Sequence, residues 1–260
     1  MRTRSNAPLA AAALFIAALA APSGAPVAQE SGSKILDSGR LVVFSHGDPV
    51  GTEDFQFETR HDTLFVTSQA NRKARTSGGA IQPYMKSMEV IARNDDWALL
   101  TYASTERFQG HTVNRSILLS DTTLTVAIEK DTYGTADKLV RLPGRIYVMD
   151  AGLFTLFDVI GRSLHGRIFG PRPVPLVALG DQNVSIDATA TPAGRDTIRW
   201  GTRPVVADRI TLADSTSTFT LFTGPSGSLL RLENAQADLV VMREPPAVPA
   251  VAKRHRPPKR

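Results

Sequence analysis

The chain contains no cysteine among its 260 residues. Disulfide bonds, thiol nucleophiles, cysteine-ligated zinc and iron–sulfur clusters are therefore excluded. We likewise expect no lipidated N-terminal cysteine. Hydrophobic residues make up 42% of the chain, which is enough for one sizeable core or two small ones.

The body of the chain has no excess of positive charge, although the net charge of the whole chain is +5 and its pI is near 9.7. Arg2 and Arg4 precede an apolar N-terminal run, and five more basic residues lie at the other end: Lys253, Arg254, Arg256, Lys259 and Arg260. Removing these seven charges from +5 leaves −2 for residues 5–252. Because a nucleic-acid-binding domain needs a basic folded surface, we expect no nucleic-acid partner.

Long hydrophobic runs are absent after the N-terminus, so we expect no transmembrane segment in the mature chain. The run Ala7–Ala21 is shorter than the ~20 residues of a spanning helix and leads into a segment rich in proline. Ala18–Ala20 has the small-x-small form of a signal peptidase site. We predict a signal peptide at 1–20, cleaved after Ala20, and a periplasmic or secreted protein; an uncleaved anchor is the alternative.

The C-terminal segment 245–260 is rich in proline and ends in the basic stretch Lys253–Arg260. Proline at this density disfavours helix and sheet pairing, so we predict a disordered tail. Its cations would attract an anionic component of the cell envelope. The alternative is a solvated tail that aids solubility.

The body of the chain alternates apolar and polar residues with a period of two, between short polar turns. This pattern predicts a mainly β fold, an antiparallel meander of roughly fourteen strands. Separate strands are predicted at 183–190 and 197–200, and a turn at 133–137. Because so many strands do not make one flat sheet, we expect a barrel, half-barrel or spiral.

One segment has the period of a helix. Leu153, Leu156, Phe157, Ile160 and Leu164 recur at the spacing of one helical face. We predict an amphipathic helix near 153–165, packed in the concavity of the sheet. The predicted organisation is a flexible segment at 21–37, a single β domain at 38–244, and the tail.

Several features occur in a familiar order along residues 38–243. They are Gly51–Glu53 in an early hairpin, Tyr147–Asp150 before the helix, a proline-bounded strand at Val174–Leu179, and the closing strands Gly227–Glu233 and Val240–Arg243. The order resembles uncharacterised families of bacterial envelope proteins with a long curled antiparallel sheet, and more distantly the lipoprotein-carrier half-barrels. This resemblance implies a secreted or periplasmic location and a concave apolar interior. It carries no catalytic residues.

Alternation places Glu53 on the same strand face as Phe55 and Phe57, and it places Arg115 among apolar residues of its own strand. Unpaired buried charges are costly, so each needs a partner or an opening to water. We predict a ligand site whose polar anchors and apolar lining are Glu53, Phe55, Phe57, Arg115, Phe154 and Phe157. The alternatives are strand-end or bulged positions for the charges, and core positions for the aromatics.

The five histidines show no ligand spacing, and we expect no metal and no cofactor. Ser163 and His165 point about 200° apart on a helix and do not pair directly. The sequence therefore names no reaction. The first functional prediction is a binding protein for a lipid or other amphiphile; the alternative is a structural or protein-interaction factor with a filled core, and a hydrolase ranks third.

Overall fold

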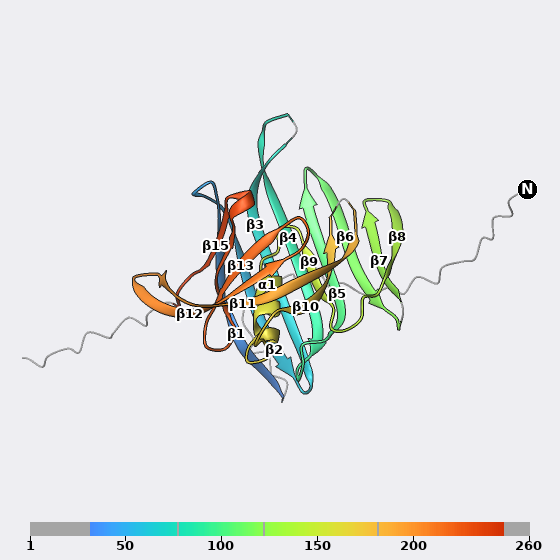
Figure 1. Cartoon of the computed structure of the whole chain (residues 1–260). Coiled ribbons are helices and arrows are strands. Elements are labelled where there is room, and N and C mark those ends of the chain that lie inside the picture. The colour runs from blue at the N-terminus through green and yellow to red at the C-terminus, as the bar shows by residue number, and fades with distance from the viewer. Residues whose placement is uncertain (1–31, 77, 122, 181, 247–260) are drawn as a thin grey trace, which may run out of the picture. The chain divides into compact units, whose positions relative to one another are not determined.

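The computed structural model describes residues 32–246, except 77, 122 and 181. The predicted signal peptide and the Lys253–Arg260 stretch lie outside these residues. Within them, fifteen strands form one sheet (Figure 1). The first nine are β1 (Ser33–Ser45), β2 (Asp48–Arg60), β3 (Thr63–Arg75), β4 (Ile81–Arg93), β5 (Leu99–Phe108), β6 (His111–Leu119), β7 (Thr123–Lys130), β8 (Tyr133–Val140) and β9 (Tyr147–Asp150).

The helix α1 (Thr155–Leu164) follows β9, and the remaining strands follow the helix. They are β10 (Arg172–Leu179), β11 (Val184–Trp200), β12 (Arg203–Ala213), β13 (Thr218–Thr223), β14 (Leu229–Asn234) and β15 (Leu239–Arg243), with a short 3-10 helix η1 (Ala235–Ala237) before β15. No helix in the described part of the chain is long and apolar enough to cross a membrane.

The strand order is β8-β7-β6-β5-β4-β3-β2-β1-β15-β14-β13-β12-β11-β10-β9. Neighbours are antiparallel except β9 and β10, which are parallel. Two meanders are therefore joined where β1 pairs with β15. The predicted fold class, a curled antiparallel sheet with one helix, is confirmed.

The sheet curls without closing, because β8 and β9 are its two end strands. Side-chain hydrogen bonds reach β8 from the start of β11, where a closed barrel would have backbone pairing between strands. Asn183 donates to the Asp137 carboxylate at 2.6 Å, and Ser185 donates to the Val140 carbonyl at 2.9 Å. The structure is barrel-like, with two free strand edges.

Most strands form where the alternation predicted them, but β9 was not predicted. β1 begins at Ser33, inside the segment 21–37 that was predicted to be flexible, because Ser33–Ile35 pair with the end of β2. β11 is one long strand where two were predicted, and its register shifts between Pro192 and Arg195. Pro192 and Gly194, which has φ of 85°, supply the bulge that bends it without ending it. β8 begins at Tyr133, inside a predicted turn, because pairing with β7 outweighs a weak strand propensity there.

α1 lies inside the curve of the sheet (Figure 1). All of its residues except Arg162 are buried, including the polar Thr155, Asp158 and Ser163. The backbone approaches β13–β14 closely: a Cβ on Gly161 would lie 2.8 Å from the carbonyl oxygen of Gly227. A residue with a side chain at position 161 would prevent this close packing of the helix against the β13–β14 connection.

Candidate functional site

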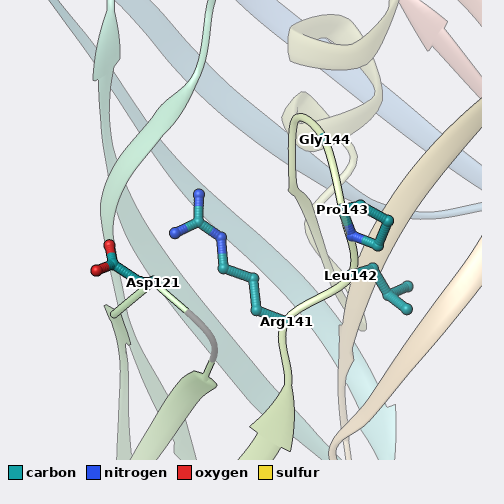
Figure 2. Close-up of a pocket in the computed structure, with 5 residues that line it drawn as sticks. All are labelled: Asp121, Arg141, Leu142, Pro143 and Gly144. Atoms are coloured by element: carbon teal, nitrogen blue, oxygen red, sulfur yellow. The ribbon is translucent and has the colours of Figure 1, made fainter.

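An open cavity of about 430 Å³ lies beside the connection from β8 to β9. It is lined by Asp121, Arg141, Leu142, Pro143 and Gly144 (Figure 2). Figure 2 shows the Arg141 side chain between Asp121 and the loop that carries Pro143 and Gly144. Arg141 donates to the carbonyl of Ser120 at 2.7 Å. None of the six predicted site residues lines this cavity.

Five of those six residues lie around α1 instead, and the first of them is Glu53. This side chain on β2 is fully buried, and its two carboxylate oxygens accept hydrogen bonds from the backbone N–H groups of Phe154 at 2.6 Å and Thr155 at 3.1 Å. The helix has no side-chain cap of its own. Glu53 therefore satisfies two N–H groups that a helix start leaves unpaired, and its charge complements the helix dipole.

Arg72 holds the segment just before the helix. It pairs with Gly51 across β2 and β3, where the missing Cβ leaves room for its stem. Its guanidinium donates to the carbonyl of Gly152 and stacks on the ring of Phe154 at 4.7 Å. Burial lowers the pKa of Arg72, and the negative charge of Glu53 opposes that change.

A buried ion pair, Lys86 with Asp150, fixes the end of β9. The ammonium of Lys86 lies 2.5 Å from the Asp150 carboxylate and donates to the carbonyl of Ala151 at 3.0 Å. Asp150 also accepts from the hydroxyls of Tyr102 at 2.6 Å and Ser104 at 2.9 Å. Burial, together with the Asp150 charge, raises the pKa of Tyr102, so its hydroxyl stays a donor.

Arg115 joins this cluster through Glu106. Arg115 lies 3.0 Å from the Glu106 carboxylate, which is also 3.3 Å from Lys86. Tyr84 stands beside them, and burial raises its pKa well above the ordinary value. Arg115 is thus mostly buried and paired, about one side chain removed from the residues that touch the helix.

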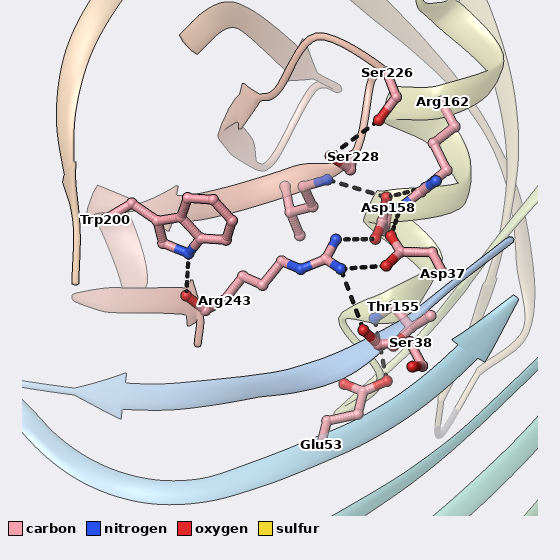
Figure 3. A network of polar contacts seen from close by, with 11 residues as sticks. Asp37, Ser38, Glu53, Thr155, Asp158, Arg162, Trp200, Ser226, Ser228 and Arg243 are labelled. Atoms are coloured by element: carbon pink, nitrogen blue, oxygen red, sulfur yellow. Dashed lines mark hydrogen bonds and ion pairs between the residues drawn. The ribbon is translucent and has the colours of Figure 1, made fainter. Parts of the chain in front are cut away.

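A second polar cluster holds the middle and end of α1 (Figure 3). Asp158 accepts from Arg162 at 2.7 Å and from the backbone N–H of Leu229 at 3.0 Å. Asp37 on β1 lies between Arg162 and Arg243, with the Arg243 contact at 2.5 Å. Helix, β1, β14 and β15 therefore meet in one charged network.

The aromatic site residues pack against the two clusters. Arg162 lies over the ring of Phe57 at 4.5 Å, and Arg243 lies over Phe55 at 4.9 Å. Phe154 and Phe157 stack with ring centroids 6.5 Å apart. These four rings are buried in the main core with the helix.

The structure thus brings Glu53, Phe55, Phe57, Phe154 and Phe157 together around α1, and it places Arg115 nearby through Glu106. Sequence reasoning missed other charged residues that hold the helix: Asp37, Arg72, Lys86, Arg162 and Arg243. Alternation with Met88 and Val90 was a signal that could have placed Lys86 on the inner face.

Ser163 and His165 do not face each other. The Ser163 hydroxyl is buried and hydrogen-bonds to the Tyr147 hydroxyl and the Ile160 carbonyl, both at 2.8 Å. His165 is exposed beyond the end of the helix. Ser163 therefore helps to seat the helix against β9.

Replacing Glu53 with glutamine tests the cap. In Glu53→Gln one of the two helix N–H groups would face an amide NH₂ in place of a carboxylate oxygen, and the charge near the helix dipole would be lost. We expect a loss of about 2 kcal/mol in the free energy of unfolding, measured by denaturant titration. Glu89→Gln, an exposed position on β4, is the matched control and should change stability by less than about 0.5 kcal/mol. Equal stabilities of the two variants would contradict the capping role.

Asp37 gives the second cluster a defined pH dependence. Burial acts to raise its pKa, but the hydrogen bonds and charges of Arg243 and Arg162 prevail and hold the pKa below its ordinary value of 3.8. Its stabilisation is therefore present above the ordinary value and lost as the pH falls through the lowered one. Asp37→Asn should destabilise the protein by about 2 kcal/mol at neutral pH.

The difference in unfolding free energy between wild type and Asp37→Asn should shrink as the pH falls below about 4, because Asp37 of the unfolded wild type then takes up a proton, and it should be lost once the folded state is protonated as well. Denaturant titrations across this range measure it. Asp187→Asn, an exposed position on β11, should track the wild type at every pH. A difference for Asp37→Asn that stays constant with pH would show that its charge is not what stabilises the network.

Comparison with known proteins finds likeness only at the level of the fold. No family model matches the chain, and no curated protein does. A solved β-barrel-like protein of the domain of unknown function DUF1849, from Brucella abortus, superposes with a TM-score of 0.50 at 8% identity, over 81% of this chain and 97% of that one. A DUF1089 family protein from Pseudomonas aeruginosa gives 0.42 at 12% identity, over 68% and 87%. The chain is therefore similar in fold to a barrel-like protein of an uncharacterised family, as its pattern predicted.

Proposed function

We propose that this chain is an exported, non-enzymatic binding protein whose concavity is filled by its own helix, so that partners bind on its outer surface and rims. This is the filled-core alternative that the sequence left open. The observation that carries it is the burial of α1, whose start is held by the Glu53 carboxylate. The barrel-like fold is compatible with such a role.

The residues predicted to line a ligand site supply the main support. Both carboxylate oxygens of Glu53 accept hydrogen bonds from the helix backbone, and Arg162 of the helix covers the ring of Phe57. A lipid bound among these residues would have to displace Phe154 and Phe157 from the core. It would also leave the acceptor oxygens and the cations of both clusters without their partners, which is costly inside a protein.

Export is the second part of the proposal and rests on the sequence alone. The basic start, the apolar run Ala7–Ala21 and the small residues at 18–20 support cleavage after Ala20. The mass of the chain recovered from the producing cell would test this part. A mature chain that begins at Ala21 is the expected result, and an intact N-terminus on a membrane-bound chain would favour the anchor.

Native mass spectrometry tests the filled core. The purified chain should have the mass of its polypeptide alone, and its thermal stability should be unchanged after unfolding, organic extraction and refolding, because no ligand contributes to the core. A copurified lipid, together with lower stability after extraction, would support the carrier prediction and contradict this proposal.

A further inference from the structure

One rim of the curled sheet is linked by contacts between several loops. Ser33, at the start of β1, pairs with Arg60, at the end of β2. The β2–β3 turn accepts a hydrogen bond from the β4–β5 turn, from Asn94 N–H to the Asp62 carbonyl at 2.8 Å. Arg167 in the loop after α1 donates to the carbonyl of Asp95 at 3.1 Å. We call these segments, 33–36, 61–62, 94–97 and 165–171, the Phe169 rim.

Large apolar side chains are exposed on this rim. Phe169 is 92% exposed, and Ile35 and Leu36 are 57% and 42% exposed. The residue before Phe169, Ile168, packs against the main core, so the loop is anchored while its aromatic ring projects into solvent. An aromatic ring this exposed costs hydration free energy that burial against another surface would recover.

Cations without carboxylate partners flank these apolar side chains. Arg167 and Arg172 donate to backbone carbonyls, and no carboxylate of the described residues lies within ion-pair distance of either one or of Lys34. Among the other rim charges, Arg60 pairs with Glu58, Arg93 with Asp95 and Asp96, and Arg145 with Asp96. The Asp62 carboxylate accepts a hydrogen bond from the Thr63 hydroxyl and has no ion pair among the described residues. The unpaired cations therefore coincide with the exposed apolar groups, at both Phe169 and Ile35.

We propose that the Phe169 rim docks on an anionic lipid bilayer, with Phe169 entering the boundary between headgroups and acyl chains and Arg167, Arg172 and Lys34 facing lipid phosphates. The inference rests on the proposed function, because it places the partner outside the filled concavity. A projecting aromatic side chain flanked by cations is the combination that interfacial binding uses. A fluid bilayer accepts a single ring without a shaped pocket, whereas a protein hot spot needs one.

The segment after Pro246 adds charge of the same sign. Residues 247–260 carry five Lys or Arg side chains and no carboxylate side chain. Each basic residue near an anionic membrane strengthens binding about fivefold. The segment would therefore strengthen binding to an anionic bilayer. Insertion of Phe169 would make that binding depend on apolar contact with the bilayer as well as on charge.

Flotation with vesicles tests the proposal on the purified mature chain. Wild type should float with phosphatidylglycerol-containing vesicles and far less with phosphatidylcholine vesicles. Phe169→Ala should weaken binding about tenfold, and Arg172→Gln about fivefold. Tyr133→Ala is the matched control, because Tyr133 is a 60% exposed aromatic at the β7–β8 turn, at the opposite end of the strands. It should bind like wild type.

Two further measurements separate insertion from simple charge attraction. A chain that ends at Pro246 should bind more weakly but keep its dependence on Phe169. The emission of Phe169→Trp should shift to the blue on vesicle binding. The proposal would be overturned if wild type did not bind the vesicles, or if Phe169→Ala bound them as well as wild type. It would also be overturned if soluble polyglutamate competed for the protein as well as anionic vesicles do. Native mass spectrometry reports on the filled core independently, so the two proposals fail separately.

Discussion

Burying a helix inside a curled sheet creates one requirement on which the rest of this structure depends: the polar groups at its ends need partners away from water. The first N–H groups of α1 meet Glu53, and the segment before them is held by Arg72 and by Lys86 with Asp150. Each charge introduced for this purpose needs a counter-charge, and the networks extend outward until they reach Glu106 and Arg115 near the surface. The interior therefore contains charged side chains because the buried helix needs partners for its polar groups.

This requirement also decides how the fold relates to function. An open concavity in a curled sheet would offer space for a ligand, but here charged side chains at both ends of α1 fix the helix between the strands. Removing the helix would expose unpaired charges as well as apolar surface, so helix and sheet are expected to open only together. We therefore assign the proposed binding to the outer surface, where unpaired cations and an exposed aromatic ring lie together.

Much of the fold could be predicted from sequence because its signals are local. Period-two alternation marked most strands, and five apolar residues at helical spacing marked α1. Glu53 and Arg115 were predicted to face inward because they alternate with apolar neighbours. The helix N–H groups that Glu53 accepts from could not be predicted, because they lie 101 and 102 residues away in the sequence. Arg243 and Asp37 are likewise 206 residues apart and meet only through the pairing of β1 with β15. Long-range pairings across a sheet leave no local signal in the sequence. In β11 the local signal was misleading, because Pro192 and Gly194 bend one strand where a break between two strands was predicted.

Hydrogen exchange of the α1 amides tests the central claim, that the helix is a permanent part of the core, most directly. Under native conditions the amides of Ile160 and its helical neighbours should exchange only through global unfolding, with the same opening free energy as buried strands such as β2. Opening of α1 at a free energy several kcal/mol below that of β2 would show that the helix leaves the concavity on its own, and would contradict the account.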